Sequence, residues 1–198
     1  MRNPLNVASG YTEVFKKEYG DEDFDPVTTA QDRTEQIIEE LLLLARSGQL
    51  IDEPATVSLS DLVDRCWSNV ETERAHLGVV DTAQIVADPN RLQHLFENRF
   101  RNAVEHGGSD VTVRVGRLKD GFYTDDEGPG IPGEDREPVV QDGYTTKREG
   151  TGFGLVIVSQ IAKVHGWELR VTEGIDGGAR FEITGVDFAP SAKADTAA

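Results

Sequence analysis

Apolar residues in the first 48 positions recur every three or four residues, which is the spacing of an amphipathic helix. The spacing predicts one helix over residues 1–20, with Pro4 in its first turn, and a second from about residue 27 to Arg46. The Gly, Asp and Pro residues from 20 to 26 predict a turn, and Ser47-Gly48 predicts the end of the second helix. The two helices form an antiparallel hairpin, which cannot bury its apolar stripe alone. The pattern therefore favours a four-helix bundle made by two copies, or packing of the hairpin on the rest of its own chain.

After a linker over residues 49–55, the pattern changes to short alternating segments separated by helical ones. Strands are expected at residues 56–59, 79–80, 85–86, 111–115, 121–124, 167–171 and 179–183. Helices are expected from a Ser60-Asp61 cap to about Arg74, from an Asp88 cap and Pro89 to Gly107-Gly108, and from the glycines at 152 and 154 onward. Residues 56–188 therefore form an α+β domain, and the small polar tail over residues 189–198 is expected to be disordered.

Composition and charge narrow the classes of function. The 198 residues carry a net charge of −16, with only six Lys among the 20 basic residues, so nucleic-acid phosphates would be repelled. The sequence has neither an apolar run of membrane-spanning length nor a signal-peptide pattern, and its single cysteine, Cys66, fits a cytoplasmic location. The acidic, Lys-poor composition fits either a halophilic protein from a high-salt cytoplasm or an ordinary soluble acidic protein.

Two glycine motifs indicate phosphate binding. They are Asp126-Glu127-Gly128-Pro129-Gly130 and Gly150-Thr151-Gly152-Phe153-Gly154-Leu155. Glycine lets the backbone approach a ligand closely, and the second motif lies where a helix begins, which offers free N–H groups to a phosphate. The polar, weakly patterned residues 132–150 between the motifs predict a mobile lid loop. Either motif alone also fits an ordinary glycine turn.

A pair of asparagines supplies a third element. Asn98 and Asn102 lie four residues apart on the helix that begins at Pro89, so they share one face. Neutral amides there can coordinate a Mg²⁺ ion that already carries phosphates and waters. The asparagine pair by itself is also compatible with an ordinary helix surface.

Taken in this order, the three motifs resemble those of the Bergerat-fold ATPases and, more closely, those of sensor histidine kinases. Residues 91–106 resemble the asparagine box, residues 126–132 the box that reads adenine, and residues 150–155 the last glycine box. The resemblance covers residues 56–187, and residues 1–48 resemble the dimerisation hairpin. It implies a helix hairpin followed by a two-layer α/β sandwich with a mixed sheet and helices on one face.

The resemblance also implies roles for these residues. Asp126 accepts a hydrogen bond from the adenine amino group. Asn102 holds Mg²⁺, and Asn98 beside it is a catalytic residue that assists Mg²⁺ or the reacting phosphate. His106 falls where the family often has an aromatic against the nucleotide, and Lys147 or Arg148 in the lid either reaches the γ-phosphate of ATP or is a solvated basic pair. The remaining nucleotide-binding candidates are Gly128, Gly130, Gly150, Thr151, Gly152, Phe153, Gly154 and Leu155. The phosphate would pass to a histidine and then to an aspartate in the receiver domain of a response regulator, within a homodimer.

Three features depart from the family pattern. A His-acid-apolar triplet precedes Arg-Asn-Pro-Leu in the family, so the phosphoacceptor would lie two residues before Met1, and ATP binding with little autophosphorylation is expected. Arg99 occupies a position that is apolar in the family, so its side chain needs a buried partner or must reach solvent. Val139-Val140 replaces the phenylalanine that usually precedes the lid.

Two other functions are compatible with the motifs. The first is an ATP-binding regulatory or trans-acting module, as in the anti-sigma relatives, but those proteins generally lack the hairpin. The second is a non-catalytic dimer scaffold, which loss of Asp126 or Asn102 would have supported; both residues are present.

Overall fold

The computed structural model describes residues 54–72, 74–140 and 154–190, together with positions 10–12, 14–15, 24, 27–28, 31 and 34. The chain divides into two compact units, Met1–Arg46 and Ser47–Ala198. Most of the predicted hairpin, most of the linker, the second half of the predicted lid and most of the predicted tail lie outside the described residues.

In the first unit, the described residues on either side of Phe24 are helical. Val27 and Thr28 both donate their backbone N–H groups to the Phe24 carbonyl, at 3.0 Å, at the beginning of the second helical stretch. The Phe15 ring stacks on the Phe24 ring with centroids 6.3 Å apart. Phe24 itself is in a turn. Tyr11 and Val14 are 61% and 56% exposed, so apolar surface on this unit is open.

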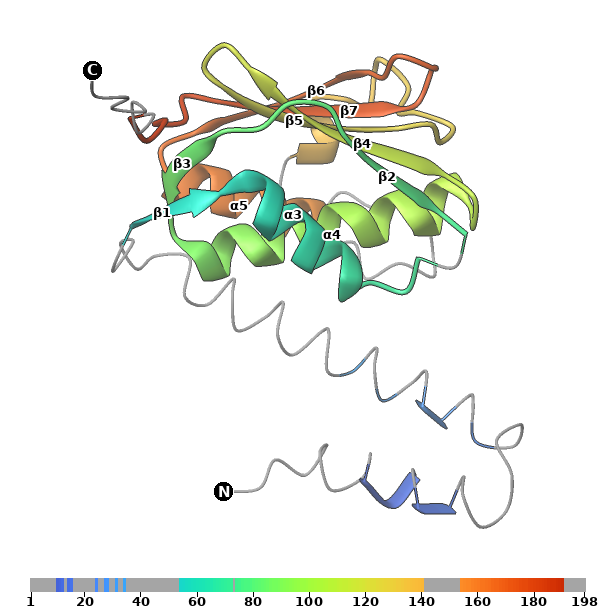
Figure 1. The fold of residues 1–198 in the computed structure, drawn as a ribbon. Coiled ribbons are helices and arrows are strands. Elements are labelled where there is room, and N and C mark those ends of the chain that lie inside the picture. The colour runs from blue at the N-terminus through green and yellow to red at the C-terminus, as the bar shows by residue number, and fades with distance from the viewer. Residues whose placement is uncertain are drawn as a thin grey trace, which may run out of the picture. The chain divides into compact units, whose positions relative to one another are not determined.

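The second unit is built on a five-stranded sheet in the order β2-β4-β5-β7-β6 (Figure 1). The strands are β2 (His76–Val79), β4 (Thr112–Leu118), β5 (Gly121–Asp126), β6 (Glu168–Glu173) and β7 (Ala179–Thr184). β2 pairs with β4 in parallel, and the other neighbours are antiparallel. The predicted mixed sheet is therefore confirmed.

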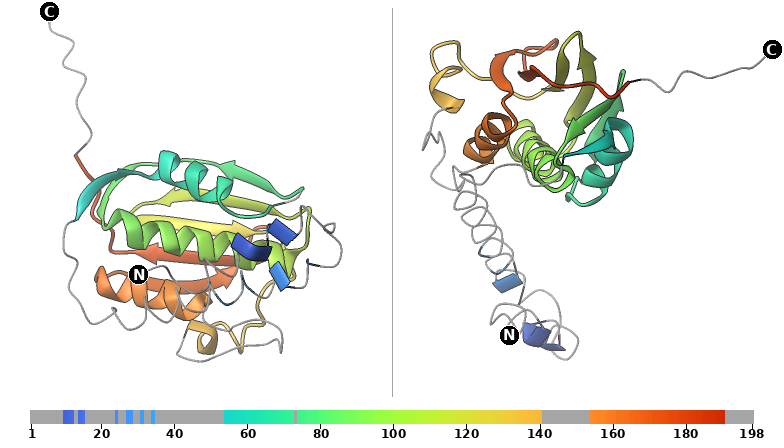
Figure 2. Two further views of the ribbon diagram at one scale, coloured as in Figure 1. Left: turned by 90° about the horizontal axis from the view of Figure 1, so that it is seen from below. Right: turned by 90° about the vertical axis from the view of Figure 1, so that its left-hand side faces the viewer.

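Three helices cover one face of this sheet (Figure 1). They are α3 (Leu59–Ser68), α4 (Pro89–Gly107) and α5 (Gly154–Val164). α4 and α5 run side by side beneath the strands (Figure 2). Their inner faces and the sheet enclose the core, whose largest fully buried side chains include Leu62, Leu92, Leu95, Phe96, Phe100, Phe122, Ile157, Ile161, Phe181 and Ile183. None of the helices in the described residues is long and apolar enough to span a membrane.

The beginning of α3 differs from the sequence prediction. Its N-cap is Ser58, whose hydroxyl accepts a hydrogen bond from the backbone N–H of Asp61, so the predicted Ser60-Asp61 cap is wrong. Leu59 is the first helical residue and is 1% exposed, because the helix must begin there to bury it. The helix also ends at Ser68, before the predicted end at Arg74, since the N–H groups of Asn69 and Val70 close short turns onto Cys66 and Trp67.

A second, two-stranded sheet lies beside the first. β1 (Ala55–Ser58) pairs with β3 (Gln84–Ala87) in antiparallel fashion. The other edge of β3 is bonded to the chain after β7: the Val86 N–H donates to the Asp187 carbonyl, and the Ala189 N–H donates to the Gln84 carbonyl. Ala189, predicted to begin the tail, is therefore tied to the folded unit.

Candidate functional site

The polar residues of the candidate site are carried on α4, whose register is fixed by its first residues. Asp88 caps the helix, and its Oδ1 accepts hydrogen bonds from the backbone N–H groups of Asn90 and Arg91 at 3.0 and 3.2 Å. Pro89 is the first helical residue, and Gly108 ends the helix with a φ of 97°. The predicted beginning and end of this helix are confirmed, and with them the placing of Asn98 and Asn102 one turn apart.

The asparagine pair meets the beginning of α5. The Asn98 Nδ2 donates to the His94 carbonyl at 2.9 Å, and the residue is 7% exposed. A Cβ built on Gly154 would lie 3.0 Å from the Asn102 amide atoms and 3.4 Å from Asn98 Oδ1. Glycine therefore allows the α5 backbone to approach both amides closely. The glycine motif does open a helix, as the sequence predicted, since α5 begins at Gly154.

The Asp126 carboxylate lies at the end of β5 and is held on both oxygens. Its Oδ1 accepts from the backbone N–H groups of Gly128 and Ala179, at 3.1 and 3.2 Å. Its Oδ2 accepts from Arg99 Nη2 at 3.2 Å. The residue is 7% exposed, so a carboxylate at the edge of the core is fixed by a loop, a strand and a helix together.

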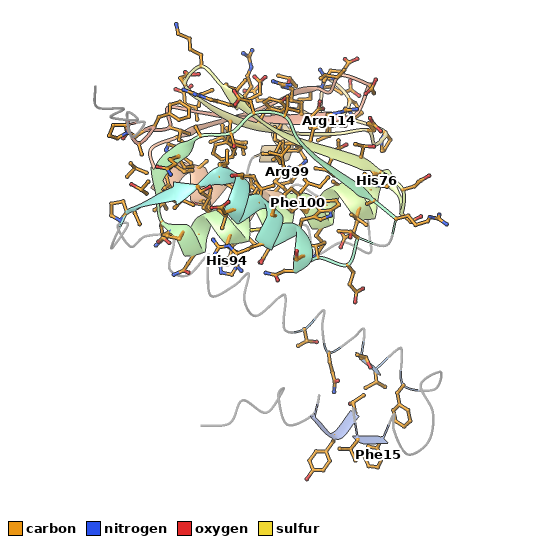
Figure 3. The ribbon with its side chains drawn as sticks, in the orientation of Figure 1. Phe15, His76, His94, Arg99, Phe100 and Arg114 are labelled. Carbon is orange, nitrogen blue, oxygen red and sulfur yellow. The ribbon has the colours of Figure 1, made fainter. Side chains whose placement is uncertain are left out.

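Arg99 is the partner of Asp126 and lies between α4 and the sheet (Figure 3). The residue is 2% exposed. Of the two alternatives that the sequence left open, a buried partner is therefore correct and a side chain that reaches solvent is wrong. Its Nε donates to Thr124 Oγ1 at 3.1 Å, and its guanidinium carbon lies 3.5 Å from the centre of the Phe181 ring. Burial lowers the pKa of Arg99 to about 10, against the opposing effect of Asp126, and the side chain is cationic at neutral pH.

The loop after β5 packs on the end of α4. A Cβ built on Gly128 would lie 2.9 Å from Asp126 Oδ1 and 3.1 Å from the Gly107 Cα, so this approach requires a residue without a side chain. Gly130 has a φ of 70°, the left-handed region that glycine adopts without strain. His106 lies on the exposed surface of the last helical turn. α4 therefore contacts the Gly154 region, Asp126 and Gly128.

An apolar cluster adjoins the acidic end of this arrangement. It contains Val139, Val171, Ala179 and Phe181, and the partly buried Ile131, Leu155 and Leu169 pack against it. Two of its members contact the charged pair directly: Ala179 donates its N–H to Asp126, and Phe181 lies under Arg99. Val139, at the position of the family phenylalanine, is buried in this cluster.

α4 and α5 are also joined at the end opposite to Asp126. His165 Nε2 accepts a hydrogen bond from the backbone N–H of Asp88 at 3.0 Å. Its Nδ1 therefore carries the proton and donates to the Ile161 carbonyl at 2.8 Å. The ring stacks on Trp167 with centroids 4.1 Å apart. Burial lowers the pKa of His165, because the charged ring would lose water.

The structure thus brings together part of the predicted set, in two groups along α4. Asn98 and Asn102 lie against Gly154, and Asp126 with Gly128 lies against another part of the helix. Lys147, Gly150, Thr151, Gly152 and Phe153 lie outside the described residues. Sequence reasoning missed Thr124 and Phe181. A signal for Thr124 was present, since it precedes Asp126 by two residues on a strand and so shares its face.

Comparison with known proteins identifies the family of this chain. Residues 87–189 match the family described as histidine kinase-, DNA gyrase B- and HSP90-like ATPase, and residues 1–50 match the His kinase A (phospho-acceptor) domain. The chain is 28% identical to sporulation kinase C of Bacillus subtilis over 197 residues, covering 92% of this chain and 46% of that protein. It therefore spans less than half the length of this relative.

Solved structures show the same fold. The ATP-binding domain of PrrB from Mycobacterium tuberculosis is 27% identical, with a TM-score of 0.56 over 70% of this chain and 100% of that one. Full-length ShkA in complex with AMPPNP is 23% identical, with a TM-score of 0.70 over 96% of this chain and 44% of that one. The chain belongs to the sensor histidine kinases, with a His kinase A domain followed by an ATPase-like catalytic domain.

Proposed function

We propose that this chain binds Mg²⁺-ATP between α4, the β5 loop and the beginning of α5, and that it is the kinase portion of a two-component system. The observation that carries the proposal is that α4 contacts a glycine helix start through two asparagine amides and an anchored carboxylate through Arg99. A helix start presents free N–H groups to phosphates, and phosphoryl transfer needs positioning and charge neutralisation above all.

In the proposed mode, the base of ATP lies against the apolar cluster of Val139, Val171, Ala179 and Phe181, with its amino group donating to Asp126. Asp126 is fixed by two backbone N–H groups, so the acceptor is oriented before the nucleotide arrives. The phosphates extend toward Gly154 and the remainder of the glycine motif. Lys147 or Arg148 would meet the γ-phosphate, and His106 would border the nucleotide.

The residues present fit a Mg²⁺ ion held mainly by the nucleotide. Asn102 and Asn98 offer neutral amide oxygens, which suit an ion that keeps phosphate and water ligands. Within the described ranges, no group of three or more His, Cys, Asp or Glu side chains could hold a metal by itself. When bound, Mg²⁺ would neutralise charge on the phosphates, while Asn98 and Asn102 would position it.

The hairpin unit is proposed to form a homodimer through its open apolar residues, including Tyr11 and Val14. The γ-phosphate is proposed to pass to a histidine in the segment that the family places directly before Arg2. None of the four histidines of this sequence lies within residues 1–48. The phosphate would then move to an aspartate of a receiver domain, the expected partner.

Binding is tested by calorimetry with a non-hydrolysable ATP analogue and Mg²⁺. The expected result is binding that is lost in Asp126→Ala and weakened in Asn102→Ala, and that is unchanged in Asp110→Ala, an exposed aspartate after α4. Loss of a charged hydrogen-bond partner is expected to weaken binding by roughly 10-fold or more. Equal affinity of the wild type and Asp126→Ala would contradict the proposed adenine site.

Transfer is tested with labelled ATP and a chain that carries a His-acid-apolar triplet directly before Arg2. Acid-labile label is expected on that chain and not on its His→Gln variant. The same label on residues 1–198 alone would overturn the assignment of the acceptor, and no label on either chain would favour the ATP-binding regulatory module.

A further inference from the structure

The Asp126 carboxylate has few acceptor positions left. A carboxylate offers about four lone-pair sites, two on each oxygen. Among the described residues, Oδ1 accepts from the N–H groups of Gly128 and Ala179, which fills both of its sites. Oδ2 accepts from Arg99. Among these contacts one lone-pair site of Oδ2 has no donor from the described residues, and its direction depends on where Arg99 holds that oxygen.

Arg99 is itself held on three sides. Nε donates to Thr124 Oγ1, Nη2 donates to Asp126 Oδ2, and the guanidinium plane lies over Phe181. Thr124, Asp126 and Phe181 come from β5 and β7, while Arg99 comes from α4. The side chain of Arg99 is 3% exposed, so it is enclosed by the protein.

We propose that Arg99 is a positioning residue that makes this site select a nucleotide with an exocyclic amine on its base, over one with a carbonyl there. The inference rests on the proposed function, namely nucleotide binding with Asp126 at the base. By fixing Oδ2 and supplying a counter-charge, Arg99 keeps the open position a pure acceptor. An amine donates to that acceptor, whereas a carbonyl oxygen would meet a carboxylate oxygen and be repelled.

Removing the guanidinium would weaken this selection in a specific way. A buried carboxylate that has lost the guanidinium fixing its Oδ2 can turn about its side-chain bonds, which removes the directed acceptor and relieves the repulsion of a carbonyl. Affinity for the amine-bearing base would then fall, while affinity for the carbonyl-bearing base would stay or rise. A purely structural role for Arg99 would instead lower both affinities by the same factor.

The test measures dissociation constants of ATP and inosine triphosphate, which differ at this group, with Mg²⁺ at pH 7. The wild type is expected to prefer ATP by roughly 10-fold or more, the range for a hydrogen bond to a charged group. In Arg99→Met the preference is expected to fall to within about threefold of unity. Arg101→Met, on the same helix, is the matched control and should retain the wild-type ratio.

A second variant covers failure of Arg99→Met to fold, which melting curves would reveal. Thr124→Val preserves shape and the ion pair but removes the acceptor of Arg99 Nε, and a ratio between the wild-type and Arg99→Met values is expected. If the wild type prefers ATP and both variants keep the full preference for ATP over inosine triphosphate, the role of Arg99 is overturned while the proposed function stands. A wild type that binds neither nucleotide would overturn the proposed function instead.

Discussion

His165 Nε2 lies 3.0 Å from the backbone nitrogen of Asp88, so the residue that follows α5 accepts a hydrogen bond from the residue that caps α4. Asp88 uses its carboxylate to cap α4 and its N–H to bind the imidazole. The ring can accept this bond only while it is neutral. The packing of two helices that carry the candidate site therefore depends on the protonation of one histidine.

Stability should fall as the solution becomes acidic. The pKa of His165 is lowered in the folded state, mainly by burial and to a small extent by Arg91, while the Ile161 carbonyl and Asp88 act in the opposite direction. The unfolded chain thus binds the proton more readily. The contribution of His165 is complete above a pH of about 6.5 and is lost as the pH falls through the lowered value.

The measurement is the urea midpoint from pH 8 to pH 5. His165→Phe keeps the stacking surface for Trp167 but removes the acceptor, so it should lower stability at pH 8 by about 1 kcal/mol and flatten the curve between pH 6.5 and 5. His76→Gln, at an exposed position on β2, is the control and should leave the slope unchanged. An unchanged slope in His165→Phe would rule out this titration.

Gly154→Ala should separate nucleotide binding from folding. The added Cβ would lie 3.0 Å from the Asn102 amide, so the amide must shift by a few tenths of an ångström, while alanine itself is favoured in a helix. We expect an unchanged melting temperature. ATP binding should weaken roughly tenfold, the effect of losing one contact between the Asn102 amide and the charged nucleotide or its Mg²⁺. Gly133→Ala, with nothing within 4 Å of its Cβ, should leave both unchanged.

The Arg99–Asp126 pair should be energetically coupled. Arg99→Met leaves a buried carboxylate unpaired and should cost about 3–5 kcal/mol in urea unfolding, and Asp126→Asn should also destabilise by leaving a buried guanidinium. The double variant should cost less than the sum of the single ones. Glu173→Gln, which breaks an exposed ion pair with Arg136, should change stability by less than about 1 kcal/mol. Additive costs in the double variant would show that the two residues act independently.

Cys66 should be inert in the native protein. It is fully buried on α3, and burial, aided by Glu97, raises the pKa of its thiol to about 12. The thiolate is the reactive form, so at pH 8 its fraction is roughly a thousandfold smaller than for an unperturbed thiol. A disulfide reagent should react in 6 M urea within minutes and in buffer only at the rate of unfolding. Fast reaction in buffer would contradict this burial.

Salt should raise the melting temperature, because a chain with a net charge of −16 repels itself. Potassium chloride shortens the screening length from about 10 Å at 0.1 M to about 3 Å at 1 M. We expect the melting temperature to rise over this range of salt, and sucrose solutions are the control for solvent exclusion. Such a rise would support the high-salt interpretation of the composition. A melting temperature that does not change would leave the chain an ordinary acidic protein.

Local chemistry explains which elements could be predicted from the sequence. The Asp88 cap and Pro89 lie beside each other in the chain, so the beginning of α4 could be predicted to the residue. Ser58 and Ser60 are equally good caps by composition, and burial of Leu59 decides between them. β2 begins three residues before the predicted strand, because its pairing with β4 includes the polar His76.

The pairing of Arg99 could not be predicted in the same way. Asp126 is 27 residues further along the chain, and the contact depends on how α4 lies across β5. The sequence indicated only that an arginine at an apolar position needs a buried partner or must extend its side chain to solvent. Tertiary packing decides which of these applies, and it pairs Arg99 with Asp126 at the end of β5.

Residues 186–189 have a practical consequence for anyone attaching a reporter to this protein. Along the edge of β3, Asp187 accepts from the Val86 N–H, the Ala189 N–H donates to Gln84, and Phe188 lies opposite Ile85. The Val186 N–H donates to the Asp120 carbonyl, in the turn between β4 and β5. A fluorophore or affinity handle joined after Pro190 would leave this edge paired. Cutting the gene after Gly185 would expose the edge of β3 and give a product prone to self-association.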